Sequence, residues 1–352
     1  MLLVDGHLDL AYNAVVLGRD VRQPIEEIRA RERQSPPGRH AGTCLVSIPE
    51  LVAGRIGIIG GSLFVAPAWK RWQEEAQVYH NAEEAHQQAV AQLDFYRQLA
   101  DEATDVCLIR AASDLDATLR SWESGTPQVG IFVIMEGADP IRTPEELRWW
   151  VERGLRGVGL SWAAGTRYAG GNGNPGPLTD LGRELLRAMA DDHLLLDLSH
   201  LWEEAAEEVL DRYPGPIVAS HANPRAFVDS PRQLSDRLIE RIAERDGVVG
   251  IVPYNRMLEP GWRTSEARLP LQRVVEAIDY VCQLLGSADH VGLGSDFDGG
   301  LGVESVPREI ETIRDLRKLI PLLEARGYAP AAVTNILRDN WLRCLRAALV
   351  AF

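Results

Sequence analysis

The sequence predicts an α/β protein built on a (β/α)₈ barrel of the TIM type. Apolar runs of strand length alternate with amphipathic helical patterns along nearly all of its 352 residues. Most of these runs are continuously apolar, as expected for parallel strands that are buried on both faces. Several of them end in a histidine, aspartate or glutamate, and barrels of this type carry their active sites at the C-terminal ends of the strands.

Eight apolar runs are expected to form the barrel. In chain order these strands are Leu2–Asp5, Gly61–Ala66, Val129–Met135, Leu155–Leu160, Leu194–Leu198, Pro216–Ala219, Val248–Val252 and His290–Leu293. The clearest amphipathic helices are Ala82–Ala103, Pro144–Arg153, Thr179–Asp192, Leu201–Tyr213, Ser235–Arg245 and Pro270–Gly286, and further helices at Val306–Arg326 and Pro330–Ala348 would close the barrel from outside. The chain lacks repeats and low-complexity linkers, so residues 1–352 are expected to form one domain.

The pattern is weakest over Asp20–Gly60. A polar segment around Arg29–His40 is followed by Cys44–Pro49 and Leu51–Gly61, for which we predict an extra strand with a hairpin. A doubly wound sheet is the alternative architecture, but neither GxGxxG after the first strand nor a Walker loop occurs. Gly170–Gly176 is glycine-rich without a following Lys-Ser/Thr, and is expected to be a flexible loop at the barrel mouth.

Composition excludes several classes of partner. The net charge is −14, with no basic block, which disfavours nucleic acid and anionic membranes as partners. The 4 cysteines are far apart and lack a CxxC pair, as is typical of reduced thiols. Met1 leads straight into the first strand without a signal peptide, no apolar stretch reaches the roughly 20 residues of a membrane span, and the Ala347–Phe352 tail is no lipid-anchor signal. We therefore expect a cytoplasmic protein.

Metal-type ligands stand at the ends of five of the predicted strands. His7 and Asp9 alternate along a strand that is leaving the barrel, so both side chains point to the same side. Glu136 follows the apolar run Val129–Met135, where a carboxylate is costly unless it is paired or binds a cation. Successive strands end in two further histidines, and the last strand leads to an aspartate; these residues are His200, His221 and Asp296.

Six ligands exceed the four that a single tetrahedral zinc ion takes. Two divalent ions roughly 3.5–4 Å apart, bridged by one carboxylate, would use all of them. Glu136 is the expected bridge, because it lies between the two groups. His7, Asp9 and Asp296 would complete the site of one ion, and His200 with His221 the site of the other. The expected metal is zinc.

The remaining histidines and the tryptophans are expected to be structural. They are His40, His80, His86, His193 and His290, and Trp69, Trp72, Trp149 and Trp150. The histidines lie in polar or helical segments or just before strands, and the tryptophans have helical or loop contexts typical of packing. Ser199 adjoins His200, but neighbours on a strand face opposite sides and the chain has no G-x-S-x-G elbow, which argues against a serine hydrolase.

Five motifs together resemble the renal dipeptidase (membrane dipeptidase, peptidase M19) family of the amidohydrolase superfamily. They are Asp5-Gly-His-Leu-Asp9, Met135-Glu-Gly137, Asp197-Leu-Ser-His200, Ser220-His-Ala-Asn223 and Gly292-Leu-Gly-Ser-Asp-Phe-Asp-Gly299. The resemblance implies a binuclear zinc barrel that hydrolyses dipeptides, with the six residues as ligands and Asp296 as the acid/base group beside Glu136. It also maps an arginine that holds the substrate's C-terminal carboxylate onto Arg232, in the stretch Ser230–Asp236.

The chain departs from that family after the fourth predicted strand. There the family usually has Leu-Thr-His, whose histidine polarises the scissile carbonyl, whereas this sequence has Leu160-Ser-Trp162. An indole N–H donates one neutral hydrogen bond and cannot carry charge. Losing an oxyanion donor typically costs roughly 10²–10³ in turnover. Either Arg167, Tyr168 or the glycine-rich loop supplies the missing group, or the substrate differs.

The leading hypothesis is a metallodipeptidase in which a hydroxide held between two zinc ions attacks the amide carbonyl and Asp296 transfers the proton. A second hypothesis keeps this site but takes an N-acyl amino acid, a lactam or a lactone as substrate. A third, prompted by Trp162, is a metal-bearing binding protein or pseudo-enzyme, against which the complete ligand set argues. The expected partner is a small molecule, and a homodimer is left open.

Overall fold

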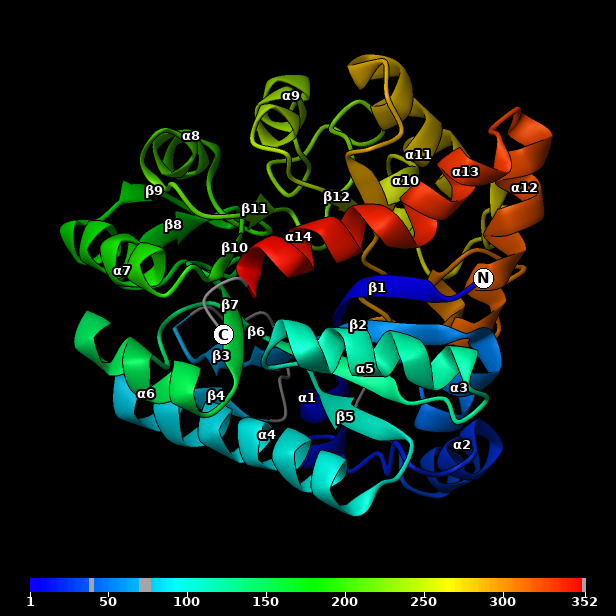
Figure 1. The fold of residues 1–352 in the computed structure, drawn as a ribbon, viewed down its shortest axis with the longest axis horizontal. Coiled ribbons are helices and arrows are strands. Elements are labelled where there is room, and N and C mark those ends of the chain that lie inside the picture. The colour runs from blue at the N-terminus through cyan, green and yellow to red at the C-terminus, as the bar shows by residue number, and fades with distance from the viewer. Residues whose placement is uncertain (38–40, 70–76, 350–352) are drawn as a thin grey trace.

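Parallel β-strands wrapped by helices form the centre of the molecule, as the computed structural model shows (Figure 1). The structure describes residues 1–37, 41–69 and 77–349. Around the barrel the strands are β1 (Leu3–Leu8), β2 (Ile56–Phe64), β6 (Val129–Glu136), β7 (Leu155–Gly159), β10 (Leu195–Asp197), β11 (Ile217–Val218), β12 (Val249–Ile251) and β13 (Val291–Leu293). The predicted TIM-type barrel is confirmed, and each predicted strand corresponds to one of these eight.

The sheet closes into a barrel through two contacts, one between β13 and β1 and the other between β11 and β12. Strand β13 pairs with both β12 and β1, with Asp5 opposite Leu293. Between β11 and β12 the contact shortens to a parallel bridge between Ala219 and Val249, where the Gly250 amide donates to the Ala219 carbonyl at 2.8 Å. Every residue of β1, β2 and β6 is buried, which accounts for their continuously apolar sequences. The short strand β5 (Val106–Leu108) pairs with the start of β6.

Helices surround the barrel (Figure 1). They are α1 (Leu10–Val15), α2 (Ile25–Gln34), α3 (Ile48–Gly54), α4 (Ala82–Glu102), α5 (Ala112–Glu123), α6 (Leu147–Glu152), α7 (Asp180–Asp191), α8 (Glu203–Arg212), α9 (Asp236–Glu244), α10 (Asn255–Leu258), α11 (Gln272–Leu285), α12 (Leu319–Arg326), α13 (Pro330–Thr334) and α14 (Asn340–Ala348). Helix α14 crosses one side of the barrel, and its Trp341 packs on Gly6 and donates from Nε1 to the Leu293 carbonyl at 2.8 Å. None of the helices in the described ranges has the length and apolarity that a membrane crossing needs.

The prediction for Asp20–Gly60 is wrong, because this segment forms two helices before β2. Helix α2 has Glu26 and Glu27 in its first turn and basic residues in its last turn, charges that complement the helix dipole. At the start of α3, the Ser47 hydroxyl caps the helix by accepting from the Glu50 amide, next to a proline in the first turn. These capping signals outweigh the strand-like apolar residues.

Three further segments differ from the prediction. The predicted helix Val306–Arg326 is shorter, consisting of a 3₁₀ turn at Ile313–Lys318 followed by α12. The glycine-rich segment is a hairpin rather than a loop, with β8 (Ala169–Gly171) antiparallel to β9 (Asn174–Leu178). Strands β3 (Ala66–Pro67) and β4 (Val78–Tyr79) form a separate pair that the sequence analysis missed. His40 and Trp72 lie outside the described residues.

Two glycines allow the strands to approach closely beside β11. A Cβ atom on Gly250 would lie 2.0 Å from the Ser220 carbonyl oxygen, and one on Gly294 would lie 1.7 Å from the same atom. Both glycines face the turn that follows β11, so the absence of a side chain lets three successive strand ends meet around Ser220.

We predict that Gly250→Ala lowers the free energy of unfolding by roughly 1–3 kcal/mol, because the methyl group would collide with rigid backbone. Urea denaturation followed by circular dichroism would measure the change. Gly176→Ala in the β9 hairpin is the matched control, since its Cβ would lie 3.5 Å from the nearest atom. Equal stability losses in the two variants would contradict this description of the packing.

Candidate metal centre

The six predicted ligands lie together at the C-terminal ends of five barrel strands. His7 is near the end of β1, Asp9 directly follows this strand, and Glu136 is the last residue of β6. The other three stand in the turns after β10, β11 and β13; they are His200, His221 and Asp296. Parallel strands bring these ends to one rim of the barrel, so residues that are up to about 290 positions apart in sequence become neighbours.

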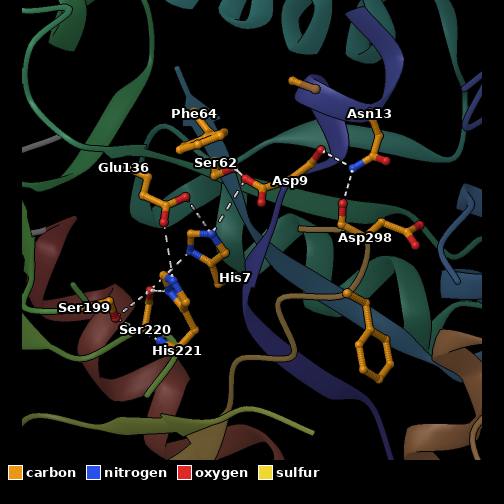
Figure 2. Close-up of polar contacts among 12 residues, drawn as sticks. His7, Asp9, Asn13, Ser62, Phe64, Glu136, Ser199, Ser220, His221 and Asp298 are labelled. Atoms are coloured by element: carbon orange, nitrogen blue, oxygen red, sulfur yellow. Dashed lines mark hydrogen bonds and ion pairs between the residues drawn. The ribbon is translucent and has the colours of Figure 1, made fainter. Parts of the chain in front are cut away.

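The Glu136 carboxylate contacts three of the histidines, and Figure 2 shows it beside His7 and His221. Its Oε2 atom is 3.3 Å from Nε2 of His7, while its Oε1 atom is 3.1 Å from Nε2 of His200 and 3.5 Å from Nε2 of His221. One oxygen therefore faces the β1 ligands and the other faces the two later histidines. This is the arrangement of a carboxylate that could be shared between two cations.

Three overlapping groups in the cluster could each hold a cation, with ligand atoms within 4.8 Å of one another. They are His7 with Asp9 and Glu136, Glu136 with His200 and His221, and His7 with His221 and Asp296. The first two match the division predicted from the sequence. The third shows that Asp296 adjoins residues of both groups, rather than the β1 ligands alone.

Two of the ligands have left-handed backbone conformations. The φ angle is 65° at His200 and 57° at Asp296, a region that residues other than glycine enter at a cost of roughly 1–3 kcal/mol. The Asp296 amide donates to the His7 carbonyl at 3.1 Å, which ties the turn after β13 to β1. Such strain is typical of functional sites, where the surrounding fold enforces the position of a side chain.

Burial and neighbouring charges set the protonation of the cluster. Burial lowers the pKa of His200 to about 4, helped by the nearby Arg232 cation, and burial and the neighbouring His7 lower the pKa of His221 well below its usual value. Burial disfavours a charged His7, but the Glu136 and Asp9 carboxylates outweigh this effect and raise its pKa well above the ordinary range. Burial and the carboxylates of Asp9 and Glu136 raise the pKa of the Asp296 carboxyl, which the His7 charge only partly offsets.

The donor chemistry of the cluster fits divalent cations. Nε2 of His200 and Nε2 of His221 lie 3.1 Å apart, and burial favours the neutral form of both rings, so a proton or a cation between the two atoms would relieve the repulsion of their lone pairs. The Nε2 atom of His7 is buried and makes no hydrogen bond within the described part of the chain. Imidazole nitrogens together with carboxylate oxygens are the ligand set of catalytic zinc and related metals.

A second layer of polar residues makes hydrogen bonds to the candidate ligands, and the sequence analysis missed its members. The Ser62 hydroxyl donates to Asp9, and the Asn13 amide group donates to the carbonyl oxygens of Asp9 and Asp298 at 2.8 and 3.0 Å (Figure 2). Nδ1 of His200 lies 3.0 Å from Oδ1 of Asn172 in the β8–β9 turn. Other contacts involve Asp197 and Ser220, whose only sequence signal is that they stand in the same short motifs as His200 and His221.

The four residues predicted to bind substrate form two pairs in the structure, one beside the cluster and one away from it. Nη2 of Arg232 donates to the His221 carbonyl at 2.7 Å, and its buried Nη1 has no hydrogen-bond partner in the described ranges. The half-buried Trp162 ring lies 6.1 Å from the His200 ring and 5.0 Å from the Phe64 ring, measured between centroids. Both residues thus adjoin the cluster.

Arg167 and Tyr168 make their contacts away from the six ligands. The Arg167 guanidinium bonds Asp139 at 3.2 Å together with three backbone carbonyls. The fully buried Tyr168 donates its hydroxyl to the Ile141 carbonyl. Their side chains hold the segment after β6, so the structure gives no support to a direct role for either in polarising the substrate.

The remaining histidines and tryptophans have structural contacts. His80 pairs with Glu84 on the surface, His193 is exposed, and Nδ1 of His290 lies 3.0 Å from the Gly247 carbonyl. His86 packs between Trp149 and Trp150, while the exposed Trp69 stacks edge-on against Tyr79. In the bonds described for it, the Ser199 hydroxyl accepts from the backbone amide of His221 and does not contact the His200 ring, in line with the argument against a serine hydrolase.

Comparison with known proteins agrees with this site. The sequence profile of the family "Membrane dipeptidase (Peptidase family M19)" matches residues 1–351. An uncharacterized protein of the pqqA 5′ region in Klebsiella pneumoniae is 34% identical over 209 residues, which are 57% of this chain and 75% of that protein. An uncharacterized dipeptidase of Schizosaccharomyces pombe is 30% identical over 206 residues, which are 57% of this chain and 48% of that protein, so the match spans about half of that relative.

A solved structure shares the whole fold. The crystal structure of dipeptidase AC, a metallopeptidase of family M19, has a TM-score of 0.79 to this chain at 25% sequence identity, and the alignment covers 99% of both chains. The metal-type ligands described above therefore stand on a barrel that a known metallopeptidase also uses.

Proposed function

Because the chain belongs to the membrane dipeptidase family, peptidase family M19, we propose that it is a binuclear, zinc-dependent hydrolase of dipeptides. The observation that carries the proposal is the position of Glu136, whose two carboxylate oxygens face separate sets of histidines. The name of dipeptidase AC, which shares the fold, supports dipeptides as the substrate class.

The two cation sites would divide the ligands as their distances suggest. His7 and Asp9 would hold one ion, His200 and His221 the other, and Glu136 would contact both. Bound there, divalent ions would polarise the scissile carbonyl and lower the pKa of water toward about 7. Asp296 adjoins both groups, so its carboxylate can help to hold the ions and still reach the reacting atoms.

Asp296 is the proposed acid/base group. Its carboxyl is only half-buried, unlike Glu136, and lies beside the ring of His7. It would accept the proton from the attacking water and return this proton to the departing amine, which must leave in neutral form.

Arg232 is the proposed anchor for the substrate's C-terminal carboxylate. One guanidinium nitrogen, Nη2, is fixed by the His221 carbonyl, and the other, Nη1, is buried without a partner among the described residues. A buried donor without a partner is costly unless a ligand satisfies it. A carboxylate bound there would accept a charged hydrogen bond and set the distance from the C-terminus to the scissile carbonyl.

Trp162 supports a second candidate substrate class. Its ring lies against Phe64 and near His200, where it adds apolar surface beside the cluster but cannot stabilise an oxyanion by charge. An N-acyl amino acid, a lactam or a lactone could use such a wall. A metal-bearing pseudo-enzyme is the remaining alternative, and the assembled ligand set disfavours it.

Metal content tests the binuclear proposal directly. Wild-type protein loaded with zinc should hold close to two ions per chain. His200→Ala should hold close to one, because the lost ligand belongs to one group, while Glu136→Gln should bind both ions weakly, because this residue is shared. Elemental analysis after gel filtration measures the ratios, and a wild-type ratio of one with excess zinc would refute the binuclear site.

Asp296→Asn should retain most of the bound metal and lose nearly all hydrolysis, since an amide can coordinate weakly but cannot accept the proton. Turnover of a dipeptide panel and metal content would be measured on the same preparation. A variant with near wild-type turnover would show that another group is the base.

Arg232→Met should raise KM for free dipeptides far more than for the same dipeptides amidated at the C-terminus, at a cost of roughly 1.5–3 kcal/mol for the lost charged hydrogen bond. Steady-state kinetics on the paired substrates measures the difference. Equal losses for both substrates would mean that Arg232 only supports the His221 backbone.

Trp162→His should increase turnover of simple dipeptides, because an imidazolium is a stronger donor to a developing oxyanion than a neutral indole. The smaller ring leaves a gap beside Phe64, so some stability should be lost. Rates on dipeptides and on N-acyl amino acids would be compared for both proteins. Fast wild-type hydrolysis of dipeptides that the substitution slows would show that the tryptophan belongs to a complete pocket.

A further inference from the structure

A single hydroxyl group contacts two histidines that belong to different cation groups. Oγ of Ser220 lies 2.7 Å from Nδ1 of His221 and 3.2 Å from Nδ1 of His7, and it also bonds Oδ2 of Asp197 (Figure 2 shows the serine and both rings). Ser220 is 2% exposed and Asp197 is 5% exposed. Water therefore does not compete for these contacts.

The chemistry of the four groups fixes the direction of each hydrogen bond. A carboxylate only accepts, so the single hydroxyl proton of Ser220 lies on the bond to Asp197. The serine oxygen then has only lone pairs left, and both must accept: one from Nδ1–H of His221 and one from Nδ1–H of His7. The Ser199 hydroxyl is more distant from the same oxygen, at 3.3 Å.

This direction decides which ring nitrogen faces the cluster without a proton. A neutral imidazole carries one N–H, so a ring that donates from Nδ1 presents a bare Nε2 atom. The Nε2 atoms of His7 and His221 are the ones that lie 3.3 and 3.5 Å from the two oxygens of Glu136. Metal-binding histidines commonly gain their orientation and tautomer in this way from an acceptor on the other nitrogen.

Asp197 is itself held rigidly. Its Oδ1 atom accepts the backbone amides of Ser199 at 3.0 Å and Ser220 at 2.8 Å, which occupies that oxygen and leaves Oδ2 for the serine hydroxyl. The aspartate ends β10 and the serine follows β11, so the pair also joins the two strands that carry His200 and His221.

We propose that Asp197 and Ser220 are positioning residues that hold His7 and His221 in the Nδ1–H tautomer and thereby prepare both cation groups through one hydroxyl. This inference rests on the proposed function in treating the groups as metal sites. It adds that the two sites are coupled: disturbing one serine should weaken ion binding on both sides of Glu136, whereas loss of a single ligand should empty one side.

Asp197→Asn is the most informative variant, because it changes hydrogen-bond direction without changing volume. The amide oxygen can still accept the Ser199 and Ser220 backbone amides, but its NH₂ group would donate to the Ser220 oxygen. The serine proton would then point to one histidine and force that ring into the Nε2–H form. A comparable aspartate-to-asparagine change in the serine protease triad acts by selecting the wrong tautomer.

Asp5→Asn is the matched control. Asp5 is also a buried strand aspartate, at 1% exposure, and its Oδ1 atom likewise accepts two backbone amides, from Ser295 at 2.8 Å and His7 at 3.2 Å. Its hydrogen bonds within the described ranges involve Ser295 and the backbone amide of His7, and none involves Ser220 or an imidazole ring. A purely structural effect of removing a buried carboxylate should therefore appear equally in both variants.

Zinc affinity, measured by competition with a chromophoric chelator, should fall roughly 10–100-fold for both ions in Asp197→Asn and by much less in Asp5→Asn. Long-range ¹H–¹⁵N NMR on metal-free protein, at a pH high enough for His7 to be neutral, should show the Nδ1–H form for His7 and His221 in the wild type, with one ring switching to Nε2–H in Asp197→Asn. Equal affinity losses in the two variants, or Nε2–H rings in the wild-type protein, would overturn the proposal.

A second pair of variants, both at Ser220, tests the proposal if Asp197→Asn does not fold. Ser220→Ala should lose zinc affinity at both sites, and Ser220→Thr, which retains the hydroxyl, should restore most of it. An alanine variant with wild-type affinity would refute the coupling. These readouts do not depend on hydrolysis, so a wild-type protein that binds two ions but leaves dipeptides intact would overturn the substrate proposal and not this one.

Discussion

The site depends on one constraint: a buried cluster of three carboxylates and three imidazoles can be stable only if positive charge is supplied within it. Glu136 is the residue on which this requirement converges, because His7 lies on one of its oxygens and His200 and His221 lie on the other. Burial favours neutral His200 and His221, so these rings cannot provide the charge themselves. The chain's own cations supply only part of this charge, because a protonated His7 and the nearby Arg232 guanidinium face three carboxylates. Divalent ions would satisfy the carboxylates and the bare nitrogens together.

The barrel fold allows these charged groups to pack closely together. Strand ends converge on one rim, and Gly250 and Gly294 let the backbone of β12 and β13 approach the Ser220 carbonyl. That approach places the Ser220 hydroxyl between the rings of His7 on β1 and His221 after β11. Left-handed turns at His200 and Asp296 then direct the last two ligands inward. The packing and the chemistry therefore share the same few residues, and a change in one should alter the other.

The eight strands and the convergence of the six candidate ligands could be predicted because both follow from local patterns: a buried parallel strand is continuously apolar, and a polar residue at its end is conspicuous. Partners across the barrel leave no such pattern. Nothing in the sequence near His7 indicates that its Nδ1 atom meets Ser220, and nothing near Asn172 indicates His200. Arg167 and Tyr168 looked suitable because they follow Trp162 closely, but the turn after β7 sends them to Asp139 and Ile141. In Asp20–Gly60, helix caps outweighed apolar residues that resembled a strand.

The central claim, that Glu136 lies between two ions, can be tested most directly by anomalous diffraction at the zinc edge from crystals of the zinc-loaded protein. The account predicts two anomalous peaks, one on each side of the Glu136 carboxylate: the first beside His7 and Asp9, and the second beside His200 and His221. A single peak at full zinc loading, or two peaks of which either lies out of reach of Glu136, would contradict it.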